Sequence, residues 1–95
     1  MATVSVAVGE DWVELTDGLS TGNWAMQVLG SAGVELAVAA SAADAASAPV
    51  NRFAGGEWCR FGRSSDSTPV WARRTGNVDS HVTLGSINMN DPRPI

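Results

Sequence analysis

Hydrophobic and polar residues alternate along much of the first half of the chain, as they do in strands with one buried face. Val4, Val6 and Val8 share one such face, and Gly9 follows as a break. On this basis, strands are predicted over residues 4–8, 12–16, 23–29 and 34–40. The tetrapeptide Gly30-Ser31-Ala32-Gly33 lies between the last two, and a turn of that length predicts a hairpin.

The second half repeats the pattern in shorter segments. Strands are predicted over residues 57–61, 69–73 and 80–84. Pro69 suits the first position of a strand or the edge of a sheet. The tripeptide Thr75-Gly76-Asn77 carries the residues of a tight turn, so it predicts a second hairpin between the last two strands.

Residues 34–48, VELAVAASAADAASA, fit two secondary structures. Their alanines favour helix, whereas the spacing of Val34, Leu36 and Val38 has the period of a strand. We predict a strand to about residue 40, then an Ala/Ser-rich loop with room for one helical turn before Pro49. A loop of that length is unusual in a small domain, so it is a candidate for function or for contact with a neighbour.

Seven or eight short strands with turn residues between them predict an all-β fold, either a small antiparallel β-sandwich or a jelly-roll-like barrel. The 95 residues suffice for one domain with a modest core. We place that domain at residues 1–85 and an extended C-terminal arm at residues 86–95. No apolar run approaches the roughly 20 residues of a transmembrane helix, and the N-terminus lacks the pattern of a secretory signal, so no membrane partner is expected.

Charge is divided unevenly along the chain. Six carboxylates and no basic residue precede Arg52, a formal charge of −6, whereas six arginines and four carboxylates give +2 from there onward. The net charge of −4 argues against nucleic acid as a partner. Every basic residue is arginine, which interfaces and carboxylate contacts favour; a GC-rich genome is the alternative explanation for the missing lysine.

Residues that could carry catalysis or hold a metal are scarce. His81, Asp79 and Cys59 form the one conceivable base, acid and nucleophile set, but the segment Glu-Trp-Cys-Arg-Phe is typical of an inward-facing cysteine in a strand. One histidine and one cysteine cannot complete a structural zinc site, and the acidic pairs lack calcium-loop spacing. We therefore expect no enzyme activity, no cofactor and no metal. The single cysteine also excludes an internal disulfide.

The four tryptophans are more informative. Trp24 is predicted to lie in the core and Trp12 to be partly exposed. Two other tryptophans each share a strand face with an arginine, which suits a cation–π contact, a protein interface or a sugar platform. The same pattern also suits rings that close the core beneath an arginine. The interface candidates are Trp58 with Arg60, Trp71 with Arg73, and Arg93 and Ile95 in the predicted arm.

Several segments, in this order, resemble small virion proteins of tailed bacteriophages. They are DWVELTDG, QVLGSAGVELAVAA, an Ala/Ser/Pro loop, GGEW and PVWARRTG, and the resemblance covers about residues 4–84. It implies a β-sandwich module that decorates or cements the head, or one that belongs to a fibre or tail. The segment SINMNDPRPI and the restriction of basic residues to arginine are not part of this shared pattern. The resemblance therefore leaves open how the protein would attach to the virion.

The expected function is that of a non-enzymatic capsid decoration or cement protein, located on the capsid surface of the virion after assembly in the host cytoplasm. The expected partners are further copies of the chain, as a trimer or similar ring, and the major capsid protein or another virion protein. Acidic and Arg-bearing patches would meet between copies, and residues 1–8 or 85–95 would reach a neighbour. The alternative is a glycan-binding β-sandwich module of a fibre, tail or spike, with Trp58 or Trp71 as its platform.

Overall fold

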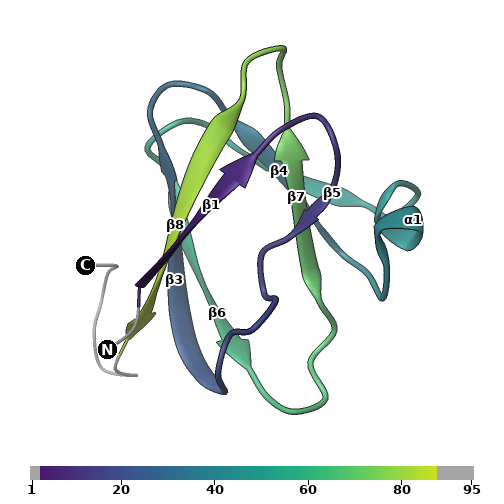
Figure 1. Cartoon of the computed structure of the whole chain (residues 1–95), viewed down its shortest axis with the longest axis vertical. Helices are drawn as coiled ribbons and strands as arrows, with labels where there is room; N and C mark the ends of the chain where they lie inside the picture. The colour runs from purple at the N-terminus through teal and green to yellow at the C-terminus, as the bar shows by residue number, and fades with distance from the viewer. Residues whose placement is uncertain (1–2, 88–95) are drawn as a thin grey trace.

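The computed structural model describes residues 3–87, which fold into two antiparallel four-stranded sheets packed face to face (Figure 1). Sheet 1 has the order β1 (Thr3–Val8), β8 (Ser80–Ile87), β3 (Gly22–Leu29) and β6 (Trp58–Arg63). Sheet 2 has the order β2 (Val13–Glu14), β7 (Val70–Arg74), β4 (Val34–Val38) and β5 (Val50–Phe53). One helical turn, α1 (Ala42–Ala45), lies between β4 and β5. The predicted all-β sandwich is therefore confirmed.

The chain pairs with itself from its middle outward. β4 pairs with β5, β3 with β6, β2 with β7 and β1 with β8, and every pair is antiparallel. The chain thus forms one long antiparallel ribbon that reverses between β4 and β5. The ribbon is rolled up, so that successive strands on each side of this reversal alternate between sheet 1 and sheet 2. This is the jelly-roll arrangement of eight strands in two sheets.

Both predicted hairpins are wrong. β3 and β4 lie in different sheets, and so do β7 and β8, so residues 30–33 and 75–79 carry the chain from one sheet to the other. The turn regions bond to each other instead: the Thr75 N–H donates to the Gly33 carbonyl at 3.3 Å and the Arg74 N–H to the Gly9 carbonyl at 2.9 Å. Turn residues specify a reversal of the chain, but the partner of each strand depends on distant contacts.

The predicted alternation places the core correctly. In β3, Trp24, Met26 and Val28 are buried, as expected for one face of a strand. The other buried members of this core cluster are Val8, Leu15, Val34, Leu36, Ala72, Val82 and Leu84. Because each large apolar side chain contributes about 1.5–3 kcal/mol when fully buried, this cluster between the sheets is the main source of stability.

The largest differences from the predicted elements concern β2, β5 and β8. β2 has two residues instead of five, and β5 was not predicted because VNRF is short and largely exposed at a sheet edge. β8 extends to Ile87, so the first two residues of the predicted arm belong to this strand; the other eight lie outside the described residues. The Ala/Ser-rich segment, which the sequence left open between loop and one helical turn, contains the turn α1, where the Asp44 N–H donates to Ser41 Oγ at 3.2 Å and caps the N-terminus.

Candidate functional site

The two tryptophan–arginine pairs lie on opposite outer faces of the sandwich. Trp58 and Arg60 belong to β6, an edge strand of sheet 1, and both point away from the core. Trp71 and Arg73 belong to β7, which lies inside sheet 2, and point outward on the other side. The structure therefore does not bring the four residues together. The remaining candidates, Arg93 and Ile95, lie outside the described residues.

Trp71 has a role within the molecule. Its indole packs on a small second cluster on the outer face of sheet 2, which contains Ala37, Ala39 and Ala45. Its Nε1 donates to the Ala39 carbonyl at 2.9 Å. The long loop with α1, which Figure 1 shows at the edge of the molecule beyond β5, is thus held against the sheet by this ring. Alanines suit this loop because small side chains let its backbone approach a flat aromatic surface.

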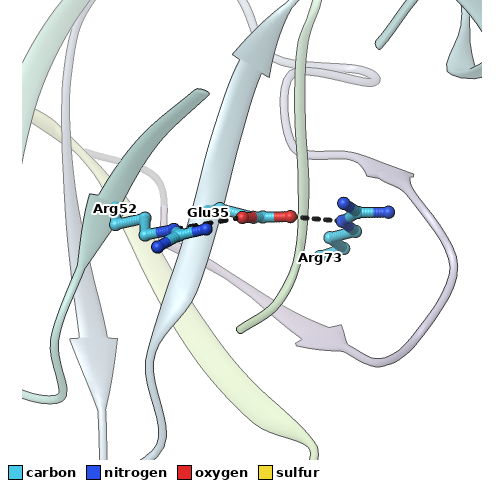
Figure 2. A network of polar contacts seen from close by, with 3 residues as sticks. All are labelled: Glu35, Arg52 and Arg73. Carbon is cyan, nitrogen blue, oxygen red and sulfur yellow. Dashed lines mark hydrogen bonds and ion pairs between the residues drawn. The ribbon is translucent and has the colours of Figure 1, made fainter. Parts of the chain in front are cut away.

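Arg73 belongs to a row of charged residues that crosses sheet 2 (Figure 2). Glu35 on β4 lies directly opposite Arg52 on β5 and directly opposite Arg73 on β7. The Arg73 Nε–H donates to Glu35 Oε1, and Arg52 Nε lies 3.5 Å from Oε2. The Glu35 side chain is only 7% exposed, whereas those of Arg73 and Arg52 are 41% and 76% exposed. A buried carboxylate is therefore flanked by two cations that reach water.

Trp12 extends this row by one member. The guanidinium carbon of Arg73 lies 4.6 Å from the centroid of the Trp12 ring, within cation–π range. One guanidinium thus satisfies the Glu35 carboxylate with its Nε–H and covers an aromatic face at the same time. Arg73 therefore lies over the ring of Trp12 and has a structural role within the molecule.

The acidic first half and the Arg-bearing second half meet within one molecule. Besides the Glu35 row, Arg74 lies 3.9 Å from Glu10 of the first half, and it also binds Asp79 of its own half at 2.6 Å. A polar hollow of about 360 Å³ lies among these charges, and it is lined by Glu10, Glu35, Arg52, Arg73, Arg74, Thr75 and Gly76. The topology explains the contacts, because each strand of the first half lies beside a strand of the second. These contacts therefore need no second copy.

The charge row yields an asymmetric prediction. Replacing Arg73 by methionine leaves the Glu35 carboxylate buried beside the more distant Arg52. We therefore expect the free energy of unfolding to fall by about 2 kcal/mol. The loss is smaller than for a fully buried pair because water reaches Arg73. Glu35→Gln removes the charge and leaves exposed arginines, so about 1 kcal/mol is expected. Urea denaturation measures both. The double variant should lose less than the sum, and strict additivity would contradict this account of the row.

The catalytic set considered above does not come together. The Cys59 side chain faces the interior and packs against the core, whereas His81 is exposed on the outer face of sheet 1. The Asp79 carboxylate is bound to Arg74 rather than to the imidazole. Burial also raises the pKa of the Cys59 thiol, so the reactive thiolate is disfavoured at neutral pH. This geometry does not form a relay from acid to base to nucleophile.

An apolar opening that the sequence did not predict lies between the two sheets at their β5 and β6 edges. This β5–β6 cleft has a volume of about 460 Å³. It is lined by Leu36, Val38, Pro49, Asn51, Phe53, Cys59, Phe61 and Val70. Cys59 and Phe61 are the inward residues of an edge strand, so no further strand of sheet 1 covers them on that side among the described residues. The alternation along β6 was the available signal, but it does not say that β6 is an edge.

Comparison with known proteins adds no identification. No family model, curated protein or solved structure matches the chain. Within residues 3–87, no helix has the length and apolar character needed to span a membrane. The same residues contain no group of three or more His, Cys, Asp or Glu side chains that could hold a metal ion.

Proposed function

We propose that this protein is a non-enzymatic virion protein that binds the capsid surface of a tailed bacteriophage as a decoration or cement protein, and that β6 carries its contact residues. The resemblance of residues 4–84 supports the virion assignment. The jelly-roll fold is compatible with it, since this fold occurs in viral capsid proteins, but it also occurs in lectins. We propose β6 as the contact surface because it carries the exposed tryptophan, Trp58.

The observation that carries this choice is the exposure of Trp58. Trp58 is 41% exposed, whereas Trp24 is buried in the core and Trp71 is packed under the loop that contains α1. Tryptophan and arginine are the residues most enriched among those that dominate binding energy, and Arg60 follows Trp58 on the same outer face. Val38, in the β5–β6 cleft, adds a further exposed apolar side chain.

We expect Trp58→Ala to weaken binding to phage heads by about 30-fold, the effect of losing one dominant interface residue of about 2 kcal/mol. Cosedimentation of purified protein with heads that lack it measures the affinity. Val78→Ala is the matched control, because Val78 is 66% exposed in the loop between β7 and β8. Equal affinity of the two variants, or no binding of the unaltered protein to heads, would count against the proposal.

The second candidate, glycan binding, draws on the same exposed ring. A half-exposed indole on an outer sheet face offers a flat apolar surface on which a sugar can stack. The two functions differ in the partner that covers Trp58, which is a phage head in one case and a polysaccharide in the other. Quenching of tryptophan fluorescence by host surface polysaccharide, lost in Trp58→Ala, together with absence of head binding, would favour the glycan function.

A further inference from the structure

We infer that two copies of this protein associate through their β6 strands, pairing antiparallel about a two-fold axis at Cys59, so that sheet 1 continues from one copy into the other. The inference deepens the proposed function, because it depends on β6 being the contact strand. It identifies the partner as a second copy of the chain. It follows from the hydrogen-bond direction along β6, the residues that face each other in this register, and the position of the β5–β6 cleft.

The direction of the backbone groups on β6 is fixed by its start. Gly56, with φ of +88°, donates to the Val28 carbonyl at 2.8 Å, and Val28 donates to the Glu57 carbonyl at 2.9 Å, which is the pattern of a glycine bulge. From this point β3 and β6 pair in regular register, with Met26 opposite Cys59. Hydrogen-bonded pairs alternate along such a ladder, so Cys59 bonds to β3. The N–H and C=O groups of its neighbours on β6 therefore point away from β3.

These outward groups define which two-fold pairings are possible. With Arg60 on the axis, two arginines would lie directly opposite each other, which is unfavourable. With Cys59 on the axis, Trp58 of each copy lies opposite Arg60 of the other in a hydrogen-bonded pair. Both pairs then place an arginine beside an exposed indole, the combination that gives a cation–π contact. An interface between identical surfaces must be self-complementary, and this register meets that requirement.

The side of the molecule that this pairing covers carries apolar surface. The edges of both sheets, β5 and β6, flank the β5–β6 cleft. Of the features that keep edge strands apart, β6 has no proline and its bulge lies before its first residue; its charged residues are Arg60 and Arg63, and Arg60 lies opposite an indole in the Cys59 register. A second copy on this edge shields Phe61 and Cys59, which line the cleft. The interface thus combines backbone pairing with apolar burial.

Proline at an outward position tests the pairing directly. Arg60→Pro removes an N–H that points away from β3, so the fold is retained while edge pairing is blocked. The matched control is Ser5→Pro on β1, the other edge of sheet 1, where the alternation of hydrogen-bonded pairs through β8 also makes the Ser5 N–H point outward. With folding checked by circular dichroism, light scattering should show a twofold drop in mass for Arg60→Pro and none for Ser5→Pro. Loss of association in Ser5→Pro would overturn the inference, because β6 would then pair with β1 of the next copy.

Cross-linking tests the register. In a non-hydrogen-bonded antiparallel pair the two Cα atoms lie about 4.5 Å apart, which permits a disulfide, so mild oxidation should link two copies through Cys59. The Cys59→Ser/Phe61→Cys variant should not link. Linking of that variant in place of the unaltered protein would overturn the Cys59 register. A monomeric unaltered protein at high micromolar concentration would overturn the inference altogether, whereas head binding by Arg60→Pro would leave the proposed function standing.

Discussion

A Gly55→Ala variant is expected to lose about 3 kcal/mol of unfolding free energy, at the upper end for overpacked sites. A Cβ atom on Gly55 would lie 2.2 Å from the Gly30 carbonyl oxygen and 2.7 Å from the Ser31 Cα. Both atoms belong to the backbone, so no side-chain rotation relieves the contact. The loop before β6 and the loop after β3 would have to separate, which disturbs both sheet crossings at this end. Urea denaturation, with circular dichroism as the probe, measures the loss.

Gly76→Ala is the control for this prediction. Gly76 also lies in a loop between the sheets, but a Cβ there would have no atom within 4 Å, and its backbone does not require positive φ. We expect its unfolding free energy to stay within about 0.5 kcal/mol of the unaltered protein. Equal stabilities of the two variants would show that the loops before β6 and after β3 are not in close contact.

Replacing Trp71 by alanine is expected to lower the unfolding free energy by about 3 kcal/mol, as for other large aromatic side chains removed from packed sites. The second cluster loses its central ring and the Ala39 carbonyl loses its indole donor. Trp71→Phe keeps most of the packing but loses the hydrogen bond, so we expect its unfolding free energy to fall by about 1 kcal/mol. Thermal unfolding compares the two variants with Trp58→Ala, whose exposed ring should contribute least.

The same variants should differ in local protection of the α1 loop. If Trp71 holds this loop, limited proteolysis should cleave Trp71→Ala within residues 39–49 faster than Trp71→Phe or Trp58→Ala. Cleavage at equal rates in all three would mean that the loop is held by other contacts, and the structural role assigned to Trp71 would be wrong.

The strands and the core could be predicted from the sequence because both depend on local alternation. Trp24, Met26 and Val28 reveal a buried face without reference to any other segment. Cys59 was likewise predicted to face inward, and it does. β5 escaped prediction because a four-residue edge strand that is mostly exposed has no buried face to produce the pattern.

The arrangement of the strands could not be predicted, because pairing is a property of residues far apart in the chain. Gly30 to Gly33 has the composition of a hairpin turn, yet this turn changes sheets. The pairing of Trp71 and Arg73 on one strand face was predicted, but Glu35 and Trp12, which engage Arg73, come from other strands or loops. The candidate site therefore divided into a structural part on sheet 2 and an exposed part at β6.

The nested pairing also governs when the protein can fold during its synthesis. β4 and β5 can pair soon after both are made, but β3 gains its neighbours only once β6 and β8 have been added. β1 has to wait for β8, the last strand of the described chain. Because the pairing of distant segments is slow, the first strands leave the ribosome with apolar faces uncovered. We therefore expect the N-terminal half to leave the ribosome unfolded and to fold cooperatively only after β8, the last strand of residues 3–87, has emerged.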